Sequence, residues 1–113
     1  MSKSASALHS LPPACAASLR KLGADLSLSR LRRKQSLRAW AQRLNVSVPT
    51  LMRLEKGDPS VGVGVYATAL WIVNRTEALS QLADPKEDLG ALELDLRAAA
   101  KRSAPRGRKS AHA

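Results

Sequence analysis

Residues 36–57 read SLRAWAQRLNVSVPTLMRLEKG, and the spacing of apolar residues in this stretch decides the fold class. In its first half, apolar side chains recur at i, i+3, i+4 and i+7, as on one face of a helix, at Leu37, Trp40, Ala41 and Leu44. Ser36 stands directly before them, where its hydroxyl can accept from an unpaired backbone N–H of the first turn. The pattern predicts a helix over 37–44.

The second half of the stretch predicts another helix over 48–56. Asn45 tolerates left-handed backbone and can end the first helix in a tight turn. Ser47 can cap the next helix, and Pro49 fits a first turn, where its missing N–H is not required. Gly57 is a typical C-terminal stop. Two short helices joined by about three residues form a helix-turn-helix arrangement.

Apolar spacing extends this pattern on both sides. Leucines at helical spacings run from Leu19 to Leu31, but Gly23 interrupts them, so we expect the first packed helix to begin near Ala24. A fourth helix is predicted over 63–74, with a strand from residue 61 as the alternative, and a fifth over 76–83. Leucine spacing over 89–97 fits a helix and a strand equally well.

Composition excludes several classes of protein. The chain has 113 residues, of which 44% are hydrophobic and 3% aromatic, enough for one small aliphatic core. A single cysteine cannot form an internal disulfide, and no Cys/His pair has zinc-ligand spacing. Both histidines, His9 and His112, lie near the termini, away from any carboxylate cluster. We therefore expect no enzyme activity, no metal site and no cofactor.

Hydropathy predicts a cytoplasmic protein. The longest uncharged apolar stretch, residues 61–73, has 13 residues, fewer than the roughly 20 that a membrane-spanning helix needs. The first 15 residues contain Ser, His and two prolines where a signal peptide has an apolar run. We expect neither membrane association nor export.

Charge is distributed unevenly along the chain. The formal net charge is +10, with six basic residues and no acid over 30–43, and five more bases and no acid over 101–113. Residues 77–97 hold six acids against Lys86 and Arg97. Acid-free basic stretches indicate a polyanionic partner such as nucleic acid, whereas the acidic block suits a different partner.

Four stretches carry a family resemblance: residues 30–33 (RLRR), 36–41 (SLRAWA), 45–47 (NVS) and 50–57 (TLMRLEKG). Over about residues 22–83 they resemble the Xre/Cro-type helix-turn-helix domain. Three further phrases, LGADL at 22–26, EKGDP at 55–59 and LADP at 82–85, look more narrowly like HipB-like antitoxins, which are encoded beside HipA-like kinase toxins. The resemblance implies an all-α, five-helix, lambda-repressor-like bundle that dimerises and binds palindromic double-stranded DNA.

The resemblance also implies a domain organisation. We expect a disordered N-terminal leader over 1–17, a DNA-binding domain over 18–84, a C-terminal dimer or partner segment over 85–100, and a basic disordered tail over 101–113. Three positions depart from the family pattern. Asn45 stands where glycine is usual, Leu37 replaces a frequent glutamine, and Trp40 replaces a smaller aliphatic core residue.

Candidate DNA-binding residues come from the resemblance and from side-chain chemistry. In the family, the second helix of the motif presents its N-terminal residues to bases, and a guanidinium one turn further on can bond guanine O6 and N7. A hydroxyl and a base at the start of the first helix can clamp phosphate, and the basic run before it adds diffuse attraction. The candidates are Ser36, Arg38, Ser47, Val48, Pro49, Thr50, Arg53, Lys56, Arg32, Arg33 and Lys34. The family also often pairs an arginine of the first helix with a glutamate of the recognition helix, here Arg30 and Glu55.

A dimer surface is predicted where apolar residues exceed what a small bundle can bury. Residues 70–73 are apolar all round their helix, and a leucine-rich segment follows near the C-terminus. The candidates are Trp71, Ile72, Leu79, Leu92, Leu94 and Leu96.

The function expected from these observations is a homodimeric repressor, the antitoxin of a HipA-like kinase toxin, that regulates its own operon. A stand-alone Xre-family regulator is the nearest alternative. An inhibitor that binds a partner protein through its acidic block, without a specific DNA site, is the alternative of another class. A basic RNA-binding or nucleoid protein is disfavoured, because aromatic residues for base stacking are few.

Overall fold

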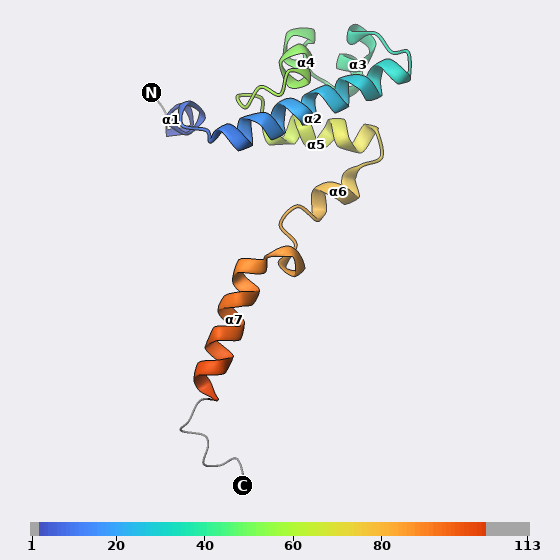
Figure 1. Ribbon diagram of the computed structural model, residues 1–113. Coiled ribbons are helices and arrows are strands. Elements are labelled where there is room, and N and C mark those ends of the chain that lie inside the picture. Colours follow the sequence, from blue (N-terminus) through green and yellow to red (C-terminus); the bar gives the residue numbers. More distant parts are fainter. Residues whose placement is uncertain (1–2, 104–113) are drawn as a thin grey trace. The chain divides into compact units, whose positions relative to one another are not determined.

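The computed structural model describes residues 3–103, in which helices are the only regular secondary structure (Figure 1). In chain order the elements are α1 (Lys3–His9), α2 (Pro13–Arg32), α3 (Leu37–Leu44), α4 (Val48–Glu55), α5 (Val63–Ile72), α6 (Thr76–Ser80), a 3-10 helix η1 (Pro85–Glu87) and α7 (Leu89–Arg102). Contacts divide the chain into two units, one through Leu79 and one from Ser80. The expected all-α class is confirmed.

The first long helix starts earlier than predicted. α2 begins with Pro13, a residue that the first turn of a helix accommodates, and its 20 residues include Gly23. The expected start near Ala24 is therefore wrong, and the segment 1–17, expected to be disordered, contains α1 and the first turn of α2. Lys34, with a positive φ of 55°, follows the end of the helix.

Gly23 lies inside α2 because another backbone passes against it. A Cβ atom built at Gly23 would lie 2.5 Å from the nitrogen of Gly57 and 2.6 Å from the carbonyl oxygen of Leu54. Gly57 has a φ of 74°, in the left-handed region that favours glycine. The pair lets α2 lie against the C-terminal end of α4 in backbone contact.

Both predicted helices of the central stretch are present. Ser36 caps α3 by accepting from the N–H of Ala39 at 3.0 Å, and Ser47 caps α4 by accepting from the N–H of Thr50 at 3.2 Å. Asn45 ends α3 with φ 58° and ψ 43°, in the left-handed conformation predicted for it. Local sequence thus determines both helices and the turn between them.

The core lies among α2, α3, α4 and α5. Its buried side chains are aliphatic apart from two aromatics, and they are Leu26, Trp40, Ala41, Leu44, Leu51, Leu54, Val61, Tyr66 and Ala69. The Tyr66 hydroxyl donates to the backbone oxygen of Asp58 at 2.9 Å, so this phenol is satisfied although it is buried. Burial raises the pKa of Tyr66 above its ordinary value. The strand alternative from residue 61 is wrong, because α5 begins at Val63.

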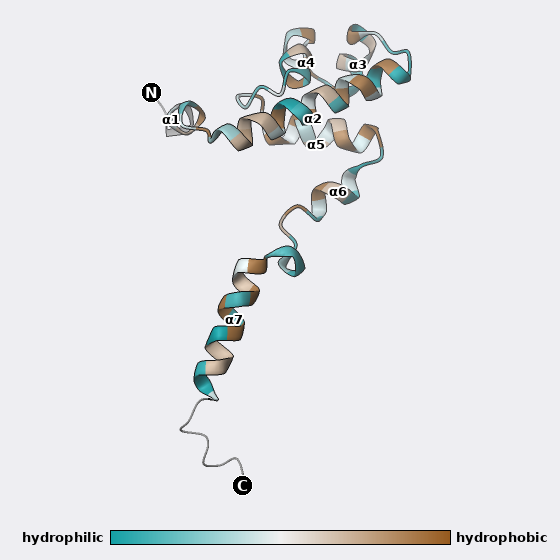
Figure 2. Ribbon diagram, in the orientation of Figure 1, coloured by the Kyte–Doolittle hydropathy of each residue, from teal (hydrophilic) through white to brown (hydrophobic). Residues whose placement is uncertain are grey.

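The chain after α5 is also helical. α6 ends at Ser80, earlier than the predicted 83, and is followed by turns up to Asp84, whose side chain caps η1. α7 settles the choice over 89–97 in favour of a helix. Its side chains are exposed along its whole length, with apolar and polar residues interleaved around it (Figure 2). The tail predicted over 101–113 is helical to Arg102, and residues 104–113 lie outside the described part.

No helix in the described part of the chain is both long enough and apolar enough to cross a membrane.

Candidate nucleic-acid interface

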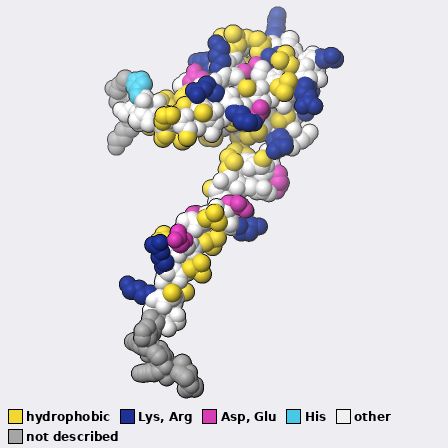
Figure 3. Space-filling model, in the orientation of Figure 1, with side chains coloured by type: hydrophobic (Ala, Val, Ile, Leu, Met, Phe, Trp, Pro, Cys, Tyr) yellow, Lys and Arg dark blue, Asp and Glu magenta, His cyan; other side chains and the backbone are white. Residues whose placement is uncertain are grey.

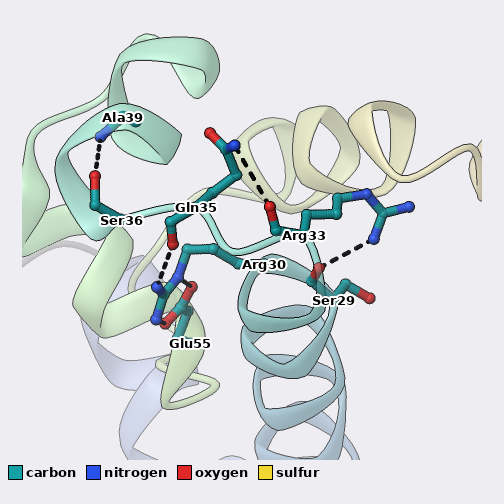
Figure 4. A network of polar contacts seen from close by, with 7 residues as sticks. All are labelled: Ser29, Arg30, Arg33, Gln35, Ser36, Ala39 and Glu55. Atoms are coloured by element: carbon teal, nitrogen blue, oxygen red, sulfur yellow. Dashed lines mark hydrogen bonds and ion pairs between the residues drawn. The ribbon is translucent and has the colours of Figure 1, made fainter.

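A buried ion pair joins α2 to α4. Arg30 donates through Nε to Glu55 Oε2 at 2.7 Å and through Nη2 to Oε1 at 3.0 Å, and each side chain is 10% exposed (Figure 4). Two parallel N–H···O bonds are the strong, geometrically specific form of such a pair. The structure thus contains the Arg30–Glu55 pair that the sequence predicted.

Arg30 also holds the loop before α3. Its Nη1 donates to the backbone oxygen of Gln35 at 2.9 Å, so one guanidinium ties together α2, α4 and the residue preceding the α3 N-cap. The hydrogen bonds to Glu55 raise the pKa of Arg30 above its ordinary value, and burial acts in the opposite direction. The pair therefore fixes α4 relative to the loop that introduces α3.

Pairing also removes a negative charge from this part of the surface. Glu55 is the only acid between residues 30 and 57, and its carboxylate faces Arg30 instead of solvent. The bases Lys34, Arg38, Arg43, Arg53 and Lys56 are all exposed. Figure 3 shows Lys and Arg side chains gathered over the part of the molecule formed by α2 to α4. Over residues 30–57 the α3–α4 surface is consequently positive, and the nearest acid beyond that range is the partly exposed Asp58.

The outward face of α4 is defined by its buried residues. Leu51 and Leu54 are each 1% exposed and face the core. By helical spacing, Pro49, Arg53 and Lys56 lie on the opposite face, and all three are exposed. The candidates Val48 and Thr50 are half-buried at the sides of the helix, and Thr50 accepts a hydrogen bond from Ser47 at 3.0 Å. Met52, 44% exposed, also lies on this face and was missed by the sequence analysis.

Arg53 has an acidic neighbour. Its Nε lies 3.8 Å from Asp58 Oδ2, and the arginine side chain is 52% exposed. Asp58 accepts from the N–H and hydroxyl of Ser60, at 2.8 and 2.7 Å, and these bonds hold the pKa of its carboxyl below the ordinary value. Asp58 stays ionised and lies close enough to attract the Arg53 guanidinium, while about half of the arginine side chain remains exposed.

The start of α3 brings together one hydroxyl and one cation. Ser36 is exposed but its Oγ is engaged in capping, whereas the side chain of Arg38 is exposed to solvent. Arg43 lies over the buried ring of Trp40, 4.9 Å from the centroid. Arg43 was not among the candidate residues. Its membership of the basic run and its spacing of three from Trp40 were the signals for it.

The basic residues at the end of α2 do not form one cluster with α4. Arg30 faces α4, and a residue two positions further on points about 200° around the helix. Arg32, at that position, and the helix C-cap Arg33 line a groove with Leu70 and Val73, at the end of α5. Lys34 is exposed in the turn that follows. The structure therefore separates Arg32 and Arg33 from the outward face of α4.

The predicted dimer residues fall on both units. On α5, Trp71 is 66% exposed and Ile72 is half-buried, and Leu79 on α6 is also half-buried. On α7, Leu92 and Leu96 share one side of the helix, whereas Leu94 lies about 160° away from each of them. The strand alternative had placed all three leucines on one face, and the helix separates Leu94 from the other two.

Metal ligands do not cluster in residues 3–103: no group of three or more His, Cys, Asp or Glu side chains there could hold an ion. Comparisons of the chain with protein-family models, with curated proteins and with solved structures found no match.

Proposed function

We propose that this chain is a sequence-specific DNA-binding repressor of the Xre/Cro type that acts as a homodimer. One observation carries the proposal: α4 exposes Pro49, Arg53 and Lys56 on one face, and the only acid between residues 30 and 57 is paired with Arg30. A capped helix held by an ion pair and presenting cations suits insertion into the major groove, which is wide enough to admit an α-helix.

In this proposal the roles of the residues follow from their positions. Val48 and Pro49, at the N-terminus of α4, contact thymine methyl groups, and Arg53 reads guanine. Arg38 and the N-terminus of α3 bind phosphate, which fixes the orientation of α4 without reading sequence. Lys56, one turn beyond Arg53 on the exposed face, binds a flanking phosphate.

The proposed homodimer matches a palindromic operator. A single α4 covers only a few base pairs, and two copies related by a two-fold axis read two half-sites one helical turn apart. The exposed apolar residues on α5 and α7 supply surface for the pairing of two copies.

The proposed biological role is that of an antitoxin that represses its own operon. This part of the proposal is supported only by the resemblance of LGADL, EKGDP and LADP to HipB-like antitoxins. A stand-alone regulator would carry the same DNA-binding surface and would have no toxin partner.

A mobility-shift assay on the DNA upstream of the gene tests the DNA-binding part. We expect a retarded complex from which excess random DNA displaces the operator poorly. The log–log salt slope of the binding constant should be about −0.9 for each phosphate contacted. Equal binding to random DNA, or a slope near zero, would reject specific recognition. Purification of the tagged chain expressed with its neighbouring genes tests the role: a co-purifying kinase-sized protein supports the antitoxin, and its absence supports the stand-alone regulator.

A further inference from the structure

A groove lies on the side of α2 that faces α5. Its volume is about 700 Å³. Its apolar lining comes from Leu22, Leu26, Leu70 and Val73, of which only Leu26 is fully buried. This lining is an aliphatic surface that the described part of the first unit leaves partly uncovered.

Cations border the same groove. Arg32, Arg33 and Arg75 contribute to its lining, and Nη1 of Arg33 donates to the backbone oxygen of Ser29 at 3.0 Å, which holds this guanidinium along α2 (Figure 4). The acid of the lining, Asp25, is paired with Lys21 at 2.6 Å. An occupant that carries carboxylates beside an apolar stripe would complement both parts of the lining.

The second unit carries such a stripe. Leu89, Leu92 and Leu96 repeat at i, i+3 and i+7 on α7 and are 75, 43 and 71% exposed. Helical geometry places Glu93 on one flank of the stripe and Asp95 on the other, and Arg97, one turn beyond Glu93, pairs with it at 3.1 Å. α7 is thus a helix whose leucine face has an acid on each side, one of them paired within the helix.

We propose that α7 of one copy of this chain docks in the groove between α2 and α5 of a second copy, and that the exchange is reciprocal. The leucine face meets the aliphatic lining, and Glu93 and Asp95 meet the arginines at its border. This inference names the contact for the proposed homodimer and rests on that part of the proposed function, and it does not depend on DNA binding.

The dimensions of the two surfaces agree. The α2 residues that line the groove run from Leu22 to Arg32, a rise of about 15 Å at 1.5 Å per residue. The leucine face of α7 spans about 11 Å from Leu89 to Leu96 on the same scale, and about 15 Å if Ala99 is included. The helix therefore fits the groove along its length.

The length of α7 favours the groove over pairing of α7 with a second α7. α7 has only 14 residues, two heptads, and an isolated helical pair of that length is marginal. Reciprocal docking in two grooves instead closes the assembly with two-fold symmetry.

Two serine substitutions on α7 test which face docks. Leu96 lies on the leucine face and Leu94 on the opposite side, with exposed fractions of 71 and 63%. In sedimentation experiments without DNA, Leu96→Ser should raise the dimer dissociation constant about tenfold or more, because each copy loses a leucine that docking buries. Leu94→Ser should leave it unchanged. Equal effects of the two substitutions, or a wild-type chain that is monomeric at micromolar concentration, would overturn the proposal.

Disulfide trapping identifies the occupant of the groove. In a Cys15→Ser background, one chain carries Ser29→Cys, in the groove, and another carries Ala99→Cys, on the leucine face of α7. Mixing the two under mild oxidation should give a disulfide-linked pair of unlike chains. A third chain that carries both substitutions tests docking within one copy. Three results would overturn the proposal: linkage of Ala99→Cys chains to each other as the main product, an internal disulfide in the chain with both substitutions, and no linkage.

Discussion

Gly23 of α2 and Gly57, just beyond α4, are in backbone contact: a Cβ atom at Gly23 would lie 2.5 Å from the Gly57 nitrogen. Gly23, Leu26 and Arg30 are the three buried positions of α2 and follow one another at i, i+3 and i+7. The close approach at Gly23 and the ion pair at Arg30 therefore lie on one face of the helix, two turns apart. Together they fix α4 along α2 at two points.

Gly23→Ala is expected to destabilise the protein although alanine is the better helix former. The added methyl would press on backbone atoms of residues 54–57, which cannot move aside as a flexible side chain can. Overpacking of this kind costs about 1–3 kcal/mol, more than the gain in helix propensity of about 1 kcal/mol at most. Chemical denaturation followed by circular dichroism measures the difference in free energy of unfolding.

Gly64→Ala is the matched control for this substitution. Gly64 lies in α5, and a Cβ atom built there meets nothing within 4 Å. The free energy of unfolding should stay the same or rise by up to about 1 kcal/mol, because alanine loses less backbone entropy. If Gly23→Ala were as well tolerated as Gly64→Ala, α2 and α4 would not be in backbone contact.

Glu55→Gln is expected to lower the free energy of unfolding by about 3–5 kcal/mol, because it leaves the buried Arg30 guanidinium without its counter-charge. Both side chains are 10% exposed, so water cannot replace the lost partner. Thermal and denaturant unfolding measure the loss. In contrast, Asp25→Ala breaks the exposed Lys21–Asp25 pair and should change stability by less than about 1 kcal/mol.

Replacement of both Arg30 and Glu55 tests whether the loss of stability in Glu55→Gln comes from the unpaired charge of Arg30. Arg30→Met with Glu55→Leu should recover most of the stability that Glu55→Gln loses, since two apolar side chains avoid the desolvation of an unpaired charge. A double variant no more stable than Glu55→Gln would show that the hydrogen bond from Arg30 to the Gln35 carbonyl contributes most of the stabilisation.

Sequence predicted the elements whose signals are local. Ser36, Asn45 and Ser47 act within one turn of their own positions, and the structure has each of them in its expected backbone role. The Arg30–Glu55 pair, 25 residues apart, was predicted by family resemblance. Spacing alone carried no information on that contact.

Gly23 led to a wrong prediction of where α2 begins, because the reason for glycine at this position is a contact with a residue distant in sequence. The sequence does not show that the backbone of Gly57 lies against Gly23, and a glycine in a helical pattern usually indicates a break. The predicted helix therefore began too late. Residues 89–97 were ambiguous for another reason: leucines at 89, 92, 94 and 96 satisfy both the strand and the helix period, and no buried partner selects one.

Asp58 should make stability depend on acid pH. Hydrogen bonds from Ser60 lower the pKa of this carboxyl in the folded state, so the folded protein binds fewer protons than the unfolded one. The contribution is complete above the ordinary carboxyl pKa of about 4 and is lost as the pH falls through the lowered value. Between pH 5 and about pH 2, the wild type should lose more stability than Asp58→Asn. Parallel loss in the two proteins would refute this role.

Within the proposed function, Arg53→Ala should weaken binding to the operator more than binding to random DNA. Arg53 lies on the exposed face of α4, and a bidentate guanidinium contact with guanine discriminates by about 1–3 kcal/mol. The measurement is a titration of operator and random duplexes at several salt concentrations.

Arg38→Ala is the matched control at the start of α3. Because Arg38 is proposed to contact phosphate, Arg38→Ala should weaken binding to both duplexes equally and reduce the salt slope by about 0.9. If Arg53→Ala gave the same pattern as Arg38→Ala, then Arg53 would contact phosphate, held back from the bases by Asp58 at 3.8 Å. Asp58→Asn would then increase affinity for both duplexes.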